Sequence, residues 1–517
     1  MTSRLPEKRP ITPGSDLAVA AEAPHRIDLL RERVEAFNEA IERAQYLALS
    51  GLSQSPGLSA VYDHFRSLFA PVVFDAVELP VGEPLEERRR AYLREFLATG
   101  IEGYESRSLQ DAFLTIEASA VVQVDGEVVP YRDLPVRIRR EHDRPSRAAL
   151  ESARLSLVAE QLNPILLEML GTAHGVARRL VDATYDRYCE DLADIDFDRL
   201  EEQTSALLDE TRDAYEDLLR YYVRRVLPGV NPDEIKTHDL ARILYGEEFH
   251  VFFPPHDMVE RIARAISSMG LDMTAGGRIE LDLEERPTKS PRAFCSVIRV
   301  PDEVKLVLKP YGGHDDYATF LHELGHALHF ANVDPEQPVE FRLLGDNGVT
   351  EGYAITFDHL TQLPEFLRRV LDVTSAEDFL RFVAFRELMF LRRYCAKFAY
   401  ERSLHRHGPS PDRAAEYAER LTEATGARTP TALYLDDVDS HFYCIRYLRA
   451  WMLTGALHQT LRDRFDVDWF RNPRTGPFLE ELWSIGQAEP VEELARGRLG
   501  IEALDFGPLL EMVYERL

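Results

Sequence analysis

The chain has 517 residues, of which 61 are Lys or Arg and 89 are Asp or Glu, giving a formal net charge of −28 at pH 7. So acidic a chain is a poor partner for nucleic acid, because phosphate binding needs clustered Lys and Arg, and an anionic membrane surface would repel it. Hydrophobic residues make up 45% of the sequence, a share typical of folded globular proteins, which excludes wholesale disorder.

No segment predicts export or insertion into a membrane. The N-terminal residues lack the apolar stretch of a secretory signal, and no run approaches about 18 uninterrupted apolar residues. The cysteines are few and scattered, without a CxxC pair, so neither a disulfide scaffold nor a zinc ribbon is expected. They are Cys189, Cys295, Cys395 and Cys444. A reducing compartment, and therefore a cytoplasmic location, is the expectation.

Apolar residues at three- and four-residue steps predict helices along most of the chain. Residues 1–24, rich in Pro, Ser, Ala and charge, predict a flexible tail instead. Beyond them, the helical spacing predicts amphipathic helices. These are expected at about 27–41, 58–68, 84–99, 145–171 and 196–226, and over almost all of the chain after residue 316.

Strand signals are few. Asp125-Gly126 lies between two β-rich runs in 115–130 and predicts a short hairpin. Residues 292–308 predict two strands, and residues 278–283 predict a third. The fold class is therefore mostly α, with a small β-sheet just before the most informative helix.

A soft boundary is expected near residues 235–250. It would separate a helical N-terminal region, residues 25–240, from a C-terminal region, residues 241–517, that carries the chemistry. No internal repeat or low-complexity tract divides the chain further.

Residues 321–330, LHELGHALHF, contain the pattern HExxH, formed by His322, Glu323 and His326. Residues four apart on a helix project from the same face, so the two imidazoles can share one zinc ion. Glu323 is rotated by about 100° from His322 and falls beside the open coordination position, where it can take a proton from water. The surrounding apolar positions predict a buried helix, in which these polar groups need partners. A metal site is favoured over histidines that are simply solvated or packed in the core.

A zinc site of this kind needs a third protein ligand and one open position. The longer HExxHxxGxxH pattern does not fit, because His329 and Asn332 stand where its glycine and third histidine would be. A carboxylate on a second helix is the alternative. Glu351 starts such a helix, 351 − 326 = 25 residues after His326, and the intervening turn signals let the chain fold back. Glu340 is a competing ligand at the end of a turn.

Other side chains near the motif are expected to support the ligands. His329 lies seven residues after His322 and shares its face, so it is expected to pack or to support a ligand rather than to bind the metal. A ligating histidine usually donates its second N–H to a carboxylate or carbonyl. Asp346 and Asp358 are both candidates for that contact, and the sequence does not choose between them.

The sequence HELGHALH, with a glutamate 25 residues after its second histidine, resembles the thimet oligopeptidase and oligoendopeptidase F family of zinc gluzincins. Residues 289–295, KSPRAFC, and the strands after them are similar to that family's sheet beside the active-site helix. Residues 145–226 are similar to its helical N-terminal region, and the resemblance covers most of 85–517. It implies a zincin-like fold with two helical halves around a deep channel. It also implies one zinc ion at the channel floor and short unfolded peptides as substrates.

The resemblance also implies a late segment that donates hydrogen bonds to the oxyanion, here residues 439–451. His441 and Tyr447 match the family's spacing, and Tyr443 could serve instead. A neutral donor is what a developing oxyanion needs; the alternative is an aromatic helix packed in the core.

Three further positions near these motifs have an open role. Arg446 and Arg449 could hold a substrate carboxylate, although solvated or ion-paired arginines are more common. Gly312-Gly313, before the HExxH helix, could let a substrate backbone approach, or could form a plain turn.

The sequence therefore predicts a zinc-dependent metalloendopeptidase that hydrolyses short peptides. Zinc would be held by His322, His326 and Glu351, with Glu323 as the general base. A related gluzincin acting as a dipeptidyl carboxypeptidase or carboxypeptidase is the alternative, and it would need a cationic residue for the substrate C-terminus. A non-catalytic peptide-binding relative is a further alternative, against which the four intact motif residues argue.

Overall fold

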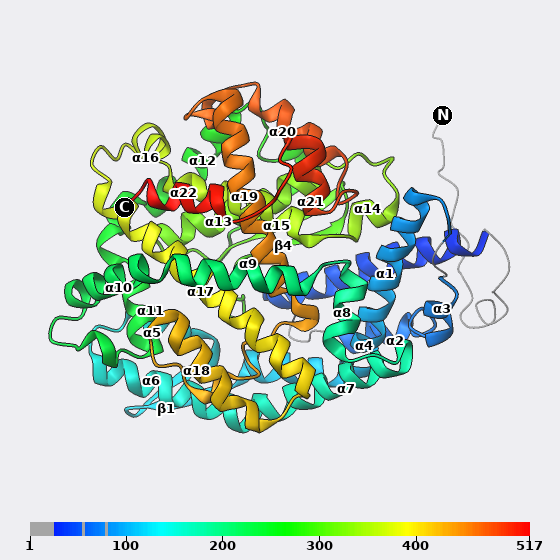
Figure 1. Cartoon of the computed structure of the whole chain (residues 1–517), viewed down its shortest axis with the longest axis horizontal. Coiled ribbons are helices and arrows are strands. Elements are labelled where there is room, and N and C mark those ends of the chain that lie inside the picture. The colour runs from blue at the N-terminus through cyan, green and yellow to red at the C-terminus, as the bar shows by residue number, and fades with distance from the viewer. Residues whose placement is uncertain (1–24, 54–56, 78–80) are drawn as a thin grey trace.

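The structure, a computed structural model, describes residues 25–53, 57–77 and 81–517. The flexible tail predicted for residues 1–24 lies outside the described residues. The described chain is mostly helical and carries two small β-sheets (Figure 1). The mostly-α class is therefore confirmed.

The first part of the chain forms a series of helices joined by short turns. They are α1 (His25–Leu49), α2 (Leu58–His64), α3 (Pro71–Asp75), α4 (Pro84–Ser119), α5 (Leu134–Arg140), α6 (Arg144–Leu157), α7 (Asn163–Val181), α8 (Tyr185–Ala193), α9 (Phe197–Glu210) and α10 (Arg212–Val226). All of the helices expected in this part are present. Helix α4 begins at Pro84, as expected, where the Glu83 side chain caps it. It continues to Ser119, beyond the expected end at residue 99.

The continuous helical pattern over residues 196–226 is divided between α9 and α10. Thr211 ends one helix and precedes the other, and its hydroxyl donates to the Leu207 carbonyl at 2.7 Å. Such a side-chain bond to the backbone competes with regular helical hydrogen bonding. The apolar pattern crosses the break undisturbed, since Leu207, Tyr215 and Tyr222 are all buried.

The second part of the chain is also helical. Its helices are α11 (Thr237–Tyr245), α12 (Met258–Ser268), α13 (His314–Ala331), α14 (Val339–Leu343), α15 (Asn347–Asp358), α16 (Pro364–Val370), α17 (Glu377–His407), α18 (Ala414–Thr425), α19 (Cys444–Phe465), α20 (Thr475–Ser484), α21 (Val491–Leu494) and α22 (Gly507–Tyr514). None of the described helices is long and apolar enough to cross a bilayer. All four cysteines are free thiols.

Both predicted strand regions are confirmed. β1 (Val121–Val124) and β2 (Glu127–Pro130) form the antiparallel hairpin, and Asp125 and Gly126 take positive φ values of 51° and 84°, as a tight hairpin turn requires. In the other sheet, β5 (Glu303–Val307) lies between β3 (Ile279–Asp282), to which it is parallel, and β4 (Phe294–Arg299), to which it is antiparallel. Helix α13 packs against this sheet.

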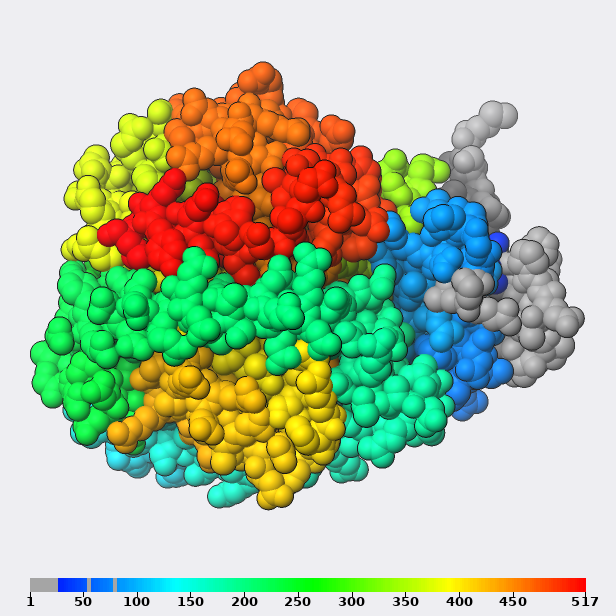
Figure 2. Space-filling view, viewed as in Figure 1, coloured from blue at the N-terminus to red at the C-terminus, as the bar shows by residue number. Residues whose placement is uncertain are grey.

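The main hydrophobic core takes residues from both sides of position 240, from Leu30 in α1 to Val513 in α22. Two smaller clusters also combine distant parts of the chain; one of them packs Tyr400 and Leu421 against Leu166. Accordingly, α17 and α18 lie beside α7 in the lower part of Figure 1. Figure 2 shows α9 and α10 as a continuous band across this face, between the C-terminal segments above and α17 and α18 below. The boundary near 235–250 stays a prediction.

Helix α15 packs closely against α13 and against α19, and glycines permit this spacing. A Cβ atom at Gly325 of α13 would lie 2.7 Å from the Cα atom of Ala354 in α15. A Cβ atom at Gly352 of α15 would lie 2.7 Å from Cδ2 of Leu453 in α19. These three helices carry the histidines, the glutamate and the tyrosine segment predicted from the sequence, so their spacing sets the geometry of the site.

Candidate metal centre

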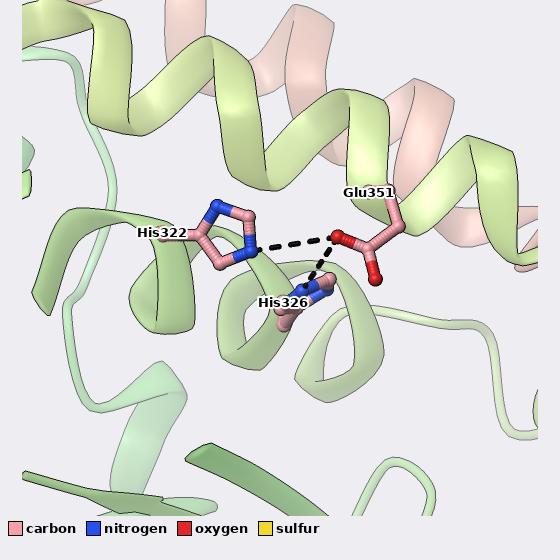
Figure 3. Close-up of side chains that lie close together, drawn as sticks. All are labelled: His322, His326 and Glu351. Carbon is pink, nitrogen blue, oxygen red and sulfur yellow. Dashed lines mark ion pairs between the residues drawn. The ribbon is translucent and has the colours of Figure 1, made fainter. Parts of the chain in front are cut away.

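Three side chains from α13 and α15 converge as the HExxH pattern predicts. His322 and His326 project from one face of α13, and Glu351 reaches them from α15 (Figure 3). The Nε2 atoms of His322 and His326 lie 3.4 and 3.5 Å from the same carboxylate oxygen, Glu351 Oε2. Ligands held at about 2.1 Å from a tetrahedral zinc ion lie about 3.4 Å from one another. The three side chains are therefore spaced as the ligands of one metal ion would be.

The chemistry of this group also fits a zinc ion. Two imidazoles and one carboxylate make a donor set found in catalytic zinc sites. Glu351 Oε2 is buried and has no hydrogen-bond partner among the described residues, and a buried carboxylate oxygen is unfavourable unless a cation or donor faces it. Burial acts to raise the pKa of Glu351, but the adjacent His326 and His322 hold it well below its usual range. The site is thus arranged for a carboxylate that remains ionised.

The second nitrogen of each imidazole contacts α15 as well. His322 Nδ1 lies 3.0 Å from Asp358 Oδ2, and His326 Nδ1 lies 2.8 Å from Thr350 Oγ1. These contacts orient the rings so that both Nε2 atoms face Glu351. The structure therefore selects Asp358 between the two aspartates that the sequence left open. Thr350 was missed, although its position directly before Glu351 places it beside the site.

The competing candidates lie elsewhere. Glu340 is fully buried and forms ion pairs with Arg31 of α1 and Arg89 of α4, so it joins the N-terminal helices to α14 instead of binding a metal. His329 is fully buried, with its ring 5.0 Å from that of Tyr353, and burial lowers its pKa to about 3. It is a packed, neutral side chain, as expected.

Glu323 is half-buried, and no hydrogen bond or ion pair engages its carboxylate within the described part of the chain. It lies near both the sheet and α19. Burial is the main cause of the raised pKa of Cys295 in β4, and the charge of Glu323 adds to it. The same charge contributes to raising the pKa of Tyr447 in α19. A carboxylate in this position, next to the three converging side chains and without a hydrogen-bond or ion-pair partner among the described residues, is available to exchange protons.

The two tyrosines of the predicted donor segment have different surroundings. The Tyr443 hydroxyl donates to Glu351 Oε1 at 2.8 Å, so this residue supports the carboxylate. The Tyr447 ring lies 5.4 Å from those of Tyr394 and Tyr443, and no described residue forms a hydrogen bond with its hydroxyl. Burial and the nearby charges of Glu351 and Glu323 raise the pKa of Tyr447 well above its usual range. Tyr447 therefore offers a neutral O–H close to the ligand group.

His441 faces a different neighbour. Its Nε2 atom lies 2.9 Å from Glu102 Oε2 of α4, and its Nδ1 atom lies 3.9 Å from Cys189 Sγ of α8. The backbone here is in the left-handed region, with φ of 53° at both His441 and Phe442, which is unfavourable for side chains of this size. Such strain commonly accompanies functional sites, and Glu102 was not identified from the sequence.

Arg446 and Arg449 are engaged in ion pairs. Both contact Asp346, at 2.7 and 2.8 Å, and Arg446 also contacts Glu95 of α4 at 2.7 Å, while Arg449 contacts Glu492. Asp346 in turn caps α15 by accepting the Gly348 amide at 3.0 Å. The ion-paired alternative for both arginines is therefore the observed one.

Gly312 and Gly313 form the turn that precedes α13. Both have positive φ, and the Asp316 carboxylate accepts the amides of Tyr311 and Gly312. A Cβ atom at Gly313 would lie 2.6 Å from the His250 ring, so the turn itself requires glycine at this position.

A second group of acidic and thiol side chains lies near the start of α19. Potential ligand atoms of Glu401, Asp439 and Cys444 also lie within 4.8 Å of one another. An ammonium group already balances their charge, because Lys397 Nζ lies 2.8 Å from Asp439 Oδ2 and 3.8 Å from Glu401. Burial raises the pKa of Glu401 to about 8. We interpret this group as a polar network that fixes the start of the tyrosine segment.

Comparison of the sequence with protein-family models and with curated proteins found no match. The functional assignment therefore depends on the geometry of the group formed by His322, His326 and Glu351.

Proposed function

We propose that this protein is a zinc-dependent metalloendopeptidase that hydrolyses short peptides, similar to the thimet oligopeptidase and oligoendopeptidase F family. The observation that carries the proposal is the convergence of His322 and His326 on Glu351 Oε2, a buried carboxylate oxygen that has no hydrogen-bond partner among the described residues. The free carboxylate of Glu323 beside them supplies the proton acceptor that peptide hydrolysis needs.

The proposed reaction uses residues with distinct roles. When bound, zinc would polarise the peptide carbonyl and lower the pKa of the attacking water. The Glu323 carboxylate accepts the proton of that water and returns it to the leaving amine. The Tyr447 hydroxyl donates a hydrogen bond to the oxygen on which negative charge develops. Asp358 and Thr350 keep the two imidazole rings oriented.

A recessed site, and with it a zincin-like channel, is supported by the partial accessibility of these groups. The side chains of His322 and Asp358 are 20% and 21% exposed, and that of His441 is 20% exposed. Burial is nevertheless the largest single influence on the pKa of each. Groups that are enclosed by protein yet reached by water lie in a recess. We propose that this recess admits an extended peptide and excludes a folded protein.

Endopeptidase action is favoured over carboxypeptidase action. The two arginines considered for a substrate carboxylate, Arg446 and Arg449, already donate to Asp346 and to other carboxylates. Binding a free C-terminus there would require these buried ion pairs to separate, which is costly. We therefore expect internal bonds of peptides with blocked termini to be cleaved.

The purified protein is expected to contain about one zinc ion per chain and to cleave a fluorogenic peptide with blocked termini. A strong chelator should abolish cleavage, and added zinc should restore it. Metal analysis and peptide kinetics on the same samples test this directly, with casein and a compact globular protein as larger substrates. Absence of stoichiometric metal, or cleavage that survives its removal, would contradict the proposal. Rapid digestion of the globular protein would contradict the recessed site.

Substitutions of Tyr447 and Tyr443 are expected to impair different steps. Tyr447→Phe removes a hydroxyl that no described residue engages, so it should lower kcat by about 10²- to 10³-fold with little change in KM. Tyr443→Phe removes a hydrogen bond to Glu351, so it should chiefly weaken zinc binding, by about 10-fold. Kinetics at saturating zinc and a zinc titration of each variant distinguish them. An unchanged kcat in Tyr447→Phe would leave that residue a packing role only.

A further inference from the structure

Glu401 of α17 bonds to both ends of the segment that leads into α19. Its Oε1 atom accepts the backbone amide of Asp439 at 2.9 Å, and its Oε2 atom accepts the Cys444 thiol at 3.2 Å. Glu401 and Cys444 are fully buried, and hydrogen bonds are stronger in such an interior than in water. A single carboxyl group therefore fixes the beginning and the end of residues 439–444.

Residues 439–444 need this support because their backbone is strained. His441 and Phe442 both have φ of 53°, in the left-handed region that is unfavourable for side chains of this size. Such a conformation persists only where the surrounding contacts determine it. Glu401 supplies those contacts at the two ends of the segment, and Glu102 of α4 supplies one in the middle, where its Oε2 atom lies 2.9 Å from His441 Nε2.

The same segment positions both tyrosines of the candidate site. Tyr443 lies within it and donates to Glu351 Oε1 at 2.8 Å. Tyr447 lies in the first turn of α19, which begins at Cys444, and its ring is 5.4 Å from that of Tyr443. A shift of residues 439–444 would therefore move the Tyr443 hydroxyl away from Glu351 and displace the helix turn that carries Tyr447.

Given the peptidase function proposed above, we infer that Glu401 is a positioning residue, which holds residues 439–444 at both ends and thereby keeps Tyr443 and Tyr447 in place for the reaction. The hydrogen bonds of Glu401 end on this segment, so the residue acts on the reaction through the tyrosines and not by contact with the peptide. Its position on α17, a helix that packs against α19, gives the segment a rigid support.

Charged groups lie close to Glu401. Lys397 Nζ, one turn earlier on α17, lies 3.8 Å from Glu401 Oε1 and 2.8 Å from Asp439 Oδ2, so this ammonium balances the Asp439 carboxylate. The other titratable and charged groups nearby have partners of their own: Asp437 pairs with Arg393 and accepts the Tyr417 hydroxyl of α18, Asp186 of α8 pairs with Arg406, Asp198 and Glu201 of α9 pair with Arg402, Tyr400 donates to the Tyr434 carbonyl, and His405 contacts His174.

Glu401 holds the segment best when its carboxyl is uncharged. Burial, together with the charge of Asp439, raises the pKa of Glu401 to about 8, although Lys397 opposes the rise. With the proton bound, Lys397 and Asp439 balance each other; without it, the cluster carries one uncompensated buried negative charge. A glutamate exposed to water has a pKa near 4.5, so release of the segment becomes easier as the pH rises from about 4.5 to about 8 and changes no further above that.

The first test compares two substitutions of Glu401 in the zinc-loaded protein, with a fluorogenic peptide that has blocked termini. Glu401→Leu removes both hydrogen bonds and should lower kcat by about 10- to 100-fold at about pH 6.5, because small displacements of reacting groups are costly. Glu401→Gln resembles the uncharged carboxyl and should restore most of that activity. Glu377→Gln, exposed in the first turn of the same helix, is the matched control and should behave as the wild type at every pH.

Hydrogen exchange gives a readout that does not need catalysis. In the wild-type protein, exchange of residues 439–447, corrected for its intrinsic pH dependence, should become faster relative to that of α12 as the pH rises toward about 8, by at most about 10-fold per pH unit. In Glu401→Gln, which has no proton to lose, the ratio between the two segments should stay constant. Mass spectrometry of peptic fragments measures both segments in one sample.

A purely structural role for Glu401 gives a different result. Glu401→Leu would then lower the melting temperature and speed exchange equally in all segments, with kcat per folded molecule unchanged, and the inference would be overturned. An equal pH dependence of exchange in Glu401→Gln and in the wild type would overturn it as well, and this comparison does not depend on whether Glu401→Leu folds.

Failure of the inference and failure of the proposed reaction are distinguishable. If no variant cleaves peptides while exchange of residues 439–447 depends on Glu401 as expected, the peptidase function is contradicted and the hold of Glu401 on this segment stands. If the wild type and Glu401→Leu cleave peptides equally well, the peptidase function stands and the positioning role is rejected.

Discussion

Replacing Glu323 with Gln is expected to lower kcat for peptide hydrolysis by about 10²- to 10⁴-fold, the usual contribution of a general base. Glutamine is nearly the same size but does not accept a proton under these conditions. Because no described residue forms a hydrogen bond or an ion pair with Glu323, the substitution should leave the fold and the zinc content unchanged. The variant should therefore be a folded, zinc-loaded and nearly inactive protein.

Kinetics on one fluorogenic peptide, together with metal analysis and circular dichroism, check this result. Glu336→Gln is the matched control, because Glu336 is exposed in the turn after α13 and the same charge is removed there. The control should retain wild-type activity. Near-normal turnover in zinc-loaded Glu323→Gln would contradict the proposed role of this carboxylate as the general base.

Changes at Glu351 and Asp358 are expected to weaken zinc binding to different degrees. Glu351→Gln removes the charge of the proposed third ligand and should lower zinc affinity by about 10²- to 10³-fold, with a matching loss of activity at low zinc. Asp358→Asn alters only the group that orients His322 and should cost about 10- to 100-fold. Glu351→Gln should have the larger effect, because Glu351 faces the Nε2 atoms of both imidazoles, whereas Asp358 contacts only the second nitrogen of His322.

Zinc titration against a competing chelator measures both affinities. Activity should return in Asp358→Asn when zinc is raised, because the ligands themselves are intact. If Glu351→Gln holds zinc as tightly as the wild type, Glu351 is not a ligand. If Asp358→Asn has the larger effect, the division between ligand and support is wrong.

The parts of this protein that local patterns describe could be predicted from the sequence. The helices follow from the spacing of apolar residues, and the hairpin follows from Asp125-Gly126. His322, Glu323 and His326 are neighbours in sequence, and Glu351 follows after a length of chain that contains clear turn signals. Spacing on α13 and α15 was enough to place these groups together.

Contacts between distant segments could not be predicted in the same way. Glu340 reads as a possible ligand until Arg31, 309 residues earlier, is seen beside it. The pairing of Glu102 with His441 and the use of Arg446 to hold Asp346 likewise join segments with no shared local pattern. The division between α9 and α10 at Thr211 is not marked by the apolar periodicity, which continues across it.

Gly325 gives one of the two variable positions of HExxH a fixed identity. Its hydrogen faces Ala354 across the contact between α13 and α15, where a Cβ atom would lie 2.7 Å from the Cα atom of that residue. Any larger residue there would push α15 outward and carry Glu351 away from the two histidines. In a mutagenesis library that randomises the two positions between the histidines, most substitutions of Gly325 are therefore expected to abolish metal binding, although Gly325 is not itself a proposed ligand. In descendants of this chain, selection that keeps Glu351 beside the two histidines should also keep glycine at position 325, 26 positions earlier.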